Sequence, residues 1–140
     1  LYSDEKFSVP ENVYIIGMMN TADRSLAMLD YALRRRFAFY EMKPGFDNEK
    51  FVEYRMNLNN PKFDKLIYVV QSLNNAIATD ESLGEGFKIG HSYFCNIKEI
   101  NESRLSNIVE YELIPMLKEY WFDEPTKVKD WSNLLRGAVK

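Results

Sequence analysis

Hydrophobic positions follow two different spacings along the chain, and the change lies near residue 45. Residues 13–19 form an apolar run with β-branched and aromatic members, broken only by Gly17. Such a run is typical of a strand buried on both faces of a parallel sheet. Residues 25–36 place leucines on one helical face, and residues 37–42 alternate toward a second strand. Strand, helix and strand in this order predict a βαβ unit with parallel strands.

From Asp47 onward the spacing becomes helical. Two long amphipathic patterns have the 3.6-residue period of a helix with one buried face. Pro115 is expected to kink the second pattern or to mark a break in it. Residues 84–90 contain three glycines and predict a flexible connection, and a last amphipathic stretch covers residues 127–135. The first pattern contains Phe63, Leu66, Ile67, Val70, Leu73 and Ile77, and the second contains Leu105, Ile108, Val109, Leu113, Met116 and Leu117.

These patterns divide the chain into two parts. Residues 1–45 read as one βαβ unit, and residues 46–140 read as a helical domain with enough length for a core of its own. Two strands alone do not make a stable sheet. The first part is therefore expected to belong to a larger α/β domain, so the fold class is an α/β fragment plus an all-α domain.

Composition and charge restrict the class of protein. Hydrophobic residues make up 46% and charged residues 28%, the balance of a soluble globular protein, and the net charge is −3. No basic stripe is visible, so direct DNA binding by this chain is disfavoured. Cys95 is the single cysteine, which excludes an internal disulfide and agrees with a reducing compartment. With no membrane-length apolar run and no signal peptide in the sequence, a cytoplasmic location and no membrane partner are expected.

The first candidate for chemistry is Asn20, which follows the first predicted strand. Ligands of open α/β sheets bind just outside the carboxyl ends of the strands. An amide there can orient a water molecule without adding charge beside a phosphate. The spacing alone favours a simpler interpretation, in which Asn20 closes a turn and Asp23 caps the next helix.

Three consecutive arginines, Arg34, Arg35 and Arg36, end the predicted helix. Successive helical residues point about 100° apart, so one surface cannot satisfy all three in the same way. Favourable placement at the negative end of the helix dipole, together with Asp30, accounts for one or two of them. Arginine is also the usual donor to a phosphoryl group in transfer. The pattern does not decide between these interpretations.

A longer motif decides more than the spacing does. The segment MNTADRSLAMLDYALRRRF, residues 19–37, resembles the signature of the McrB family, the AAA+ GTPases of 5-methylcytosine-specific restriction enzymes. The resemblance continues over nearly the whole chain. It includes PENVYIIG before the motif and PGFD, GFKIGHSYFC and EYWFDEP after it. It implies the last βαβ of an AAA+ (P-loop NTPase) large domain, followed by a helical lid domain.

The resemblance also implies roles for individual residues. Asn20 matches the sensor residue that positions the attacking water, and Asp23 and Arg24 complete the segment around it. Arg35, with Arg36 as the alternative, matches the arginine finger that reaches the next subunit's nucleotide. Gly90-His91-Ser92-Tyr93 lies where many AAA+ lids carry a second sensor arginine. This chain has none there, which leaves His91 and Ser92 as the lid-side candidates for nucleotide contact.

The cofactors implied are GTP and Mg²⁺ in the parent protein, with ATP as the alternative. No phosphate-binding loop of the G-x-x-x-x-G-K-[ST] type and no acidic magnesium motif occur in the sequence, so the chain alone is expected to hydrolyse no nucleotide. No metal site is predicted either, because His91 and Cys95 are too few for zinc. The implied partners are identical subunits in a ring, a McrC-like endonuclease partner, and DNA bound through other domains.

Two other functions remain open at this point. A related AAA+ ATPase acting on proteins, of the MoxR-like or dynein-like branch, would share the fold and the finger. A non-catalytic helical interaction module would need neither. The second alternative predicts a natural start at methionine, whereas residue 1 is Leu1. In the AAA+ interpretation, the strand that separates residues 12–19 from residues 36–42 is missing. The two are then expected to pair directly, swap between chains or stay poorly ordered.

Overall fold

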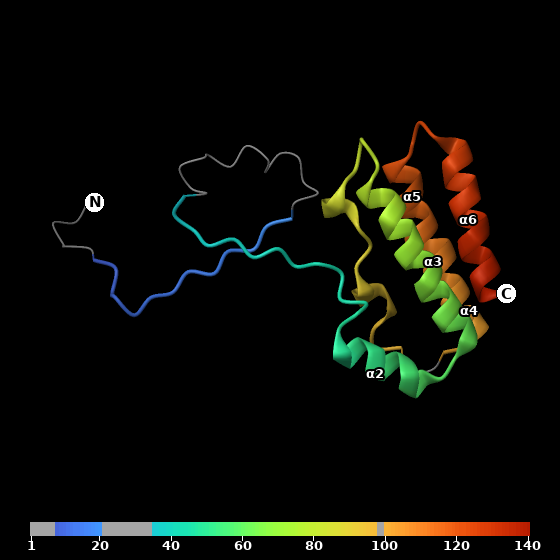
Figure 1. Ribbon diagram of the computed structural model, residues 1–140, viewed down its shortest axis with the longest axis horizontal. Helices are drawn as coiled ribbons and strands as arrows, with labels where there is room; N and C mark the ends of the chain where they lie inside the picture. Colours follow the sequence, from blue (N-terminus) through green and yellow to red (C-terminus); the bar gives the residue numbers. More distant parts are fainter. Residues whose placement is uncertain (1–7, 21–34, 98–99) are drawn as a thin grey trace.

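The computed structural model describes residues 8–20, 35–97 and 100–140. Its folded body is helical and begins at Phe46, the first buried residue of the described part (Figure 1). The helices are α2 (Glu49–Leu58), α3 (Pro61–Ala78), α4 (Glu102–Asn107), α5 (Ile114–Tyr120) and α6 (Pro125–Val139), with 3-10 turns η2 (Glu85–Phe87) and η3 (His91–Phe94) and the π-helical turn η4 (Ile108–Leu113).

Asparagines start three of these helices. The side chains of Asn48, Asn60 and Asn101 accept hydrogen bonds from backbone N–H groups in the first turns of α2, α3 and α4. These N–H groups have no partner inside the helix, so a side-chain oxygen before the first turn stabilises the helix start. Asn59 adopts the left-handed conformation that ends α2, with φ 44°. The Asn59-Asn60-Pro61 sequence thus stops one helix and starts the next.

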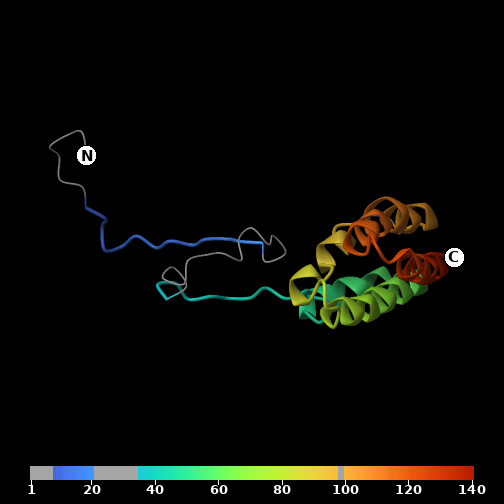
Figure 2. The same ribbon diagram turned by 90° about the horizontal axis from the view of Figure 1, so that it is seen from above.

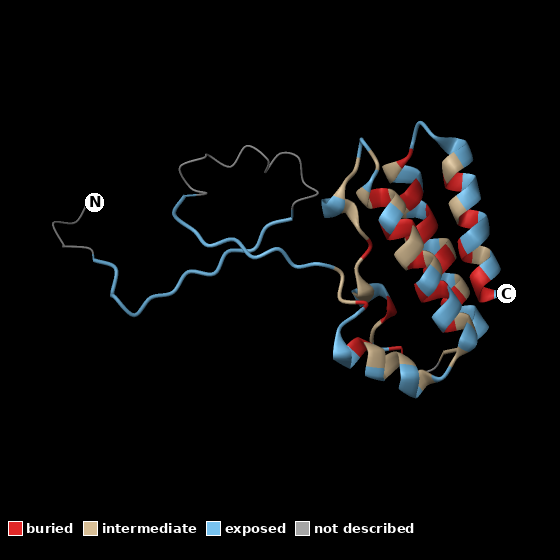
Figure 3. Cartoon of the chain, viewed as in Figure 1, coloured by how far each residue is buried: buried red, intermediate tan, exposed pale blue. Residues whose placement is uncertain are grey.

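The core forms where the apolar stripe of α3 meets the other helices. All six positions of the first predicted stripe are buried, and α3 packs most extensively against α6. Figures 1 and 2 show α3 and α6 side by side, and Figure 3 shows buried residues along the facing sides of the helices. Trp121 and Leu135 complete the core from the α5 and α6 side. The two amphipathic patterns therefore identify the buried faces correctly.

Pro115 changes the helical hydrogen-bonding pattern, as expected. The run from α4 to α5 is continuous, but residues 108–113 form a π-helical turn immediately before α5, whose first turn contains the proline. Proline has no N–H to donate, and its ring crowds the preceding turn of a regular α-helix. Where a π-helical turn occurs, it is mostly a single wider turn inside an α-helix, as here. The change at Pro115 is therefore a break in hydrogen-bond register.

The two predicted strands are not present. Residues 13–19 and 37–42 form no strand, and no strand occurs anywhere in residues 8–20, 35–97 and 100–140. Their side chains are exposed, with Ile16 at 91% and Met18 at 98%. A strand forms through hydrogen bonds to a neighbouring strand, and the described residues contain none. Figures 1 and 2 show residues 8–20 extending away from the helical body. The helix expected at 25–36 lies almost wholly outside the described residues.

The connection at residues 84–90 is held in place, contrary to the expectation of a flexible loop. The buried Asn74 of α3 donates through Nδ2 to the Ile89 carbonyl at 2.9 Å and accepts from the Ile89 N–H at 2.7 Å. Its amide thus pairs with both backbone groups of one residue. Ile89 is buried beside it. The glycines mark turns here, and the amide of Asn74 attaches the segment to α3.

Candidate functional site

Three of the five predicted catalytic residues lie in the described part of the chain. Asn20 ends the first described segment, and Arg35 and Arg36 begin the next one in a turn. All three are exposed. Asp23 and Arg24 lie outside the described residues, so the structure does not address how the five come together.

The lid-side candidate His91 occupies the junction between the N-terminal part and the helical body. Its Nδ1 accepts a hydrogen bond from the Gly45 N–H at 3.0 Å. Its ring packs edge-on against Phe51, with centroids 5.6 Å apart, and against Phe46, with centroids 6.3 Å apart. A ring nitrogen that accepts an N–H must be unprotonated, so the neutral tautomer carries its proton on Nε2. One of the two ring nitrogens is therefore committed to the backbone.

The neighbours of His91 differ in exposure. Ser92 is exposed, whereas Phe94 is fully buried against Phe46 and Phe63. Cys95 is half-buried, its Sγ donates to the His91 carbonyl at 3.4 Å, and burial raises the pKa of its thiol. A raised thiol pKa keeps Cys95 protonated and unreactive.

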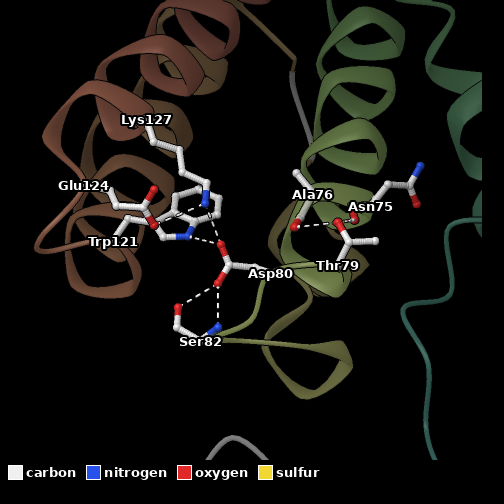
Figure 4. Close-up of polar contacts among 8 residues, drawn as sticks. All are labelled: Asn75, Ala76, Thr79, Asp80, Ser82, Trp121, Glu124 and Lys127. Atoms are coloured by element: carbon white, nitrogen blue, oxygen red, sulfur yellow. Dashed lines mark hydrogen bonds and ion pairs between the residues drawn. The ribbon is translucent and has the colours of Figure 1, made fainter.

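A polar cluster centred on Asp80, which was not predicted, links the end of α3 to the start of α6 (Figure 4). One carboxylate oxygen accepts from the Ser82 N–H at 2.9 Å and from its hydroxyl at 2.6 Å. The other accepts from the Trp121 indole at 2.8 Å and from the Lys127 ammonium at 2.5 Å. Lys127 also lies 4.6 Å from the centroid of the Trp121 ring. The carboxylate thus receives four donors, which is the arrangement of a structural anchor.

Electrostatics agree with that role. Lys127, and after it Ser82, hold the pKa of the Asp80 carboxyl well below its usual range. Asp80 in turn raises the pKa of Lys127. The Asp80 side chain is only 6% exposed. The local signal was the D-x-S spacing of Asp80 and Ser82, which favours a turn in which the aspartate accepts from the backbone two residues on. Nothing local indicated Trp121 or Lys127.

Neither a metal centre nor a membrane span occurs in the described part of the chain. Residues 8–20, 35–97 and 100–140 contain no group of three or more His, Cys, Asp or Glu side chains placed to hold a metal ion. Within the same ranges, no helix combines the length and apolar character needed to cross a membrane.

Comparison with known proteins shows which family the helical body resembles. Residues 65–129 match the family described as McrB, alpha-helical lid domain. Over 96% of its length the chain is 49% identical to the type IV methyl-directed restriction enzyme EcoKMcrB subunit of Escherichia coli (strain K12). The chain belongs to the McrB family. It spans 31% of the length of that relative.

The McrB lid match sets the positions described above in context. It begins within α3 and ends within α6, so it contains both partners of the Asn74–Ile89 pair and of the Asp80–Trp121 pair. It also contains His91, whereas Gly45 and Phe46 precede it. The contact between Gly45 and His91 therefore joins the McrB lid to the chain that leads into it.

Proposed function

We propose that this chain supplies the lid, the sensor and the arginine finger of a GTP-hydrolysing AAA+ subunit in a modification-dependent DNA restriction enzyme. The observation that carries the proposal is the similarity to the E. coli restriction enzyme. It extends over 96% of the chain and so includes the N-terminal motif as well as the lid. No phosphate-binding loop occurs in the sequence and the chain spans 31% of that relative, so in this proposal the phosphate loop is assigned to the rest of the parent protein.

In this proposal, each predicted residue acts on nucleotide held elsewhere in the ring. Asn20, supported by Asp23 and Arg24, positions the water that attacks the γ-phosphate. Arg35, or in its place Arg36, reaches the nucleotide of the neighbouring subunit, where its charge stabilises the transition state. GTP with Mg²⁺ is the proposed cofactor, with ATP as the alternative. His91 and Ser92 remain the candidates for contact from the lid side.

The same proposal defines the partners. Identical subunits form the ring, a McrC-like endonuclease cuts the DNA, and the DNA is bound by other domains of the parent protein. Hydrolysis is coupled to translocation along that DNA in the cytoplasm. The match to an McrB lid favours this branch over an AAA+ ATPase acting on proteins and over a non-catalytic helical module.

The deciding experiment measures hydrolysis by the complete protein with GTP and with ATP, in the presence and absence of methylated DNA and the endonuclease partner. We expect turnover of GTP in preference to ATP, and cleavage of DNA only when methylated sites, GTP and the endonuclease are all present. A preference for ATP, combined with stimulation by a protein substrate, would instead assign the chain to the AAA+ ATPases that act on proteins. Absence of any hydrolysis, with the complete protein folded, would favour the interaction module.

A further inference from the structure

One long-range hydrogen bond crosses the boundary between the N-terminal part and the helical body. Gly45 donates to His91, 46 positions later in the chain, at 3.0 Å. Gly45 directly precedes Phe46, the residue at which burial begins. The bond therefore acts at the point where the chain enters the lid.

The two residues match each other in shape as well as in hydrogen bonding. A Cβ atom added at Gly45 would lie 3.0 Å from Cε1 of His91 and 3.3 Å from each ring nitrogen. Contacts that short are tighter than most Cβ contacts, so a larger residue at Gly45 would require the His91 ring to shift by a few tenths of an ångström. The ring itself is fixed between Phe46 and Phe51, which follow Gly45 closely in the chain. The Gly45 backbone, the Nδ1 acceptor and the His91 ring therefore fit together in a single arrangement.

The other side of this contact is anchored in the core. Ile89, two residues before His91, is buried and doubly bonded to Asn74 of α3. Phe94, three residues after it, is fully buried. His91 therefore stands on a short segment that is held at both ends, and it can transmit the position of α3 to the entering chain.

The geometry points to His91 as a positioning residue that sets the direction in which the chain leaves the lid through Gly45. This inference rests on the proposed function for its consequence: in an AAA+ subunit, that direction sets how the lid faces the sensor and finger residues of 1–45. Hinge positions of this kind affect turnover without touching the substrate. In this inference, His91 has a role other than nucleotide contact.

Two substitutions separate the hydrogen bond from the packing of the ring. In His91→Asn the amide oxygen is attached to Cγ as Nδ1 is, so it retains an acceptor for the Gly45 N–H. In His91→Phe the ring between Phe46 and Phe51 is retained but the acceptor is lost. Hydrogen exchange of the Gly45 amide, measured by NMR on this 140-residue chain, should stay slow in the Asn variant. In the Phe variant it should accelerate by about 10-fold or more.

The amides of the α3 core serve as the internal control and should exchange at the same rate in both variants. Slow exchange of Gly45 in His91→Phe would overturn the inference, because packing alone would then hold the junction. Gly45→Ala supplies an independent arm. It should lower the melting temperature in the native background and lower it less in the His91→Asn background, where Cε1 is gone. Equal decreases of the melting temperature in both backgrounds would contradict the steric contact between residue 45 and the His91 ring.

Hydrolysis by the complete protein tests the consequence separately. His91→Phe should lose GTP turnover on the order of 10- to 100-fold, the scale of a small misplacement of catalytic groups, and His91→Asn should lose clearly less. If both variants instead bind GTP weakly, while Gly45 exchange follows the expected pattern, His91 contacts nucleotide and the positioning role is wrong. Failure of the proposed function would appear differently, as absence of GTP turnover in the native protein.

Discussion

Asp80 accepts a hydrogen bond from the indole N–H of Trp121 at 2.8 Å, although the two residues lie 41 positions apart. The bond joins the end of α3 to the turn between α5 and α6. Lys127 completes the junction from α6 by pairing with the same carboxylate oxygen. One carboxylate therefore holds together three helices that meet in the core (Figure 4).

Asp80→Asn should destabilise the chain in a pH-dependent manner. The folded-state pKa of Asp80 is depressed, mainly by Lys127. Its contribution is therefore fully present above the unfolded-state pKa of about 3.9 and is lost as the pH falls from there toward the folded-state value. We expect the substitution to cost about 1–3 kcal/mol at pH 7, with a difference that shrinks steadily below about pH 4. Urea denaturation across this pH range measures the difference.

Glu53→Gln is the matched control for Asp80. It removes a carboxylate from an exposed ion pair with Lys50, and such pairs contribute about 0–1 kcal/mol. A loss for Asp80→Asn that is no larger than for Glu53→Gln would show that the cluster adds little to stability.

Asn74→Ala should cost about 2–4 kcal/mol, because it leaves both backbone groups of Ile89 without their partner in a buried site. Asn75→Ala is the adjacent control, since Asn75 is exposed, and it should stay within about 0.5 kcal/mol of the native chain. Thermal unfolding compares the two. Similar melting temperatures for both variants would mean that residues 84–90 are not held by the amide.

The neighbouring aromatics Trp121 and Phe122 should respond in opposite ways to alanine. Trp121 is 1% exposed and hydrogen-bonded, whereas Phe122 is 82% exposed. Trp121→Ala should therefore cost about 3–5 kcal/mol, and Phe122→Ala about 0.5 kcal/mol or less. Denaturant midpoints decide the matter, and a large loss at Phe122 would mean that its ring packs against the lid.

Asn20→Ala in the complete protein should slow GTP hydrolysis with little loss of nucleotide affinity. The proposed sensor acts on the attacking water, so its interaction grows in the transition state and not on binding. Steady-state turnover and nucleotide binding are measured side by side. Equal losses in both would assign Asn20 to ground-state binding instead.

Arg35→Ala in the complete ring should lower turnover on the order of 10³-fold, the usual scale for an arginine finger. Nucleotide binding should change much less, because the charge met by the finger develops during the reaction. Arg36→Ala, one position along in the same exposed turn, is the matched comparison. The larger loss of turnover identifies the finger.

Mixing experiments test whether Arg35 acts on the neighbouring subunit. An Arg35→Ala protomer is combined with one that has an inactive phosphate loop and an intact finger. Some interfaces then pair a good nucleotide site with a good arginine, and activity should partly return. Mixed rings that form without any recovery would assign Arg35 a structural role instead.

The helical faces could be predicted from the sequence because periodicity is a local property. Each apolar position of the α3 pattern is buried, and in the later pattern Met116 alone is half-buried while the other five are buried. The resemblance carried by residues 19–37 identified the family for a similar reason, since a long sequence motif can be recognised without knowing the fold. Helix α2 was not singled out, although Asn48 before Glu49 is a good helix start.

Tertiary structure decided everything that depends on a partner far away in the chain. Trp121 and Phe122 are equivalent as apolar residues, and only the tertiary packing around the end of α5 buries one and exposes the other. Asn74 and His91 became anchors because their acceptors meet backbone N–H groups 15 and 46 positions away. The apolar runs at 13–19 and 37–42 carry strand character, but a strand also needs a neighbouring backbone, which the described residues do not provide. The local sequence pattern determines which face of a segment is apolar. Residues from distant parts of the chain determine what that face packs against.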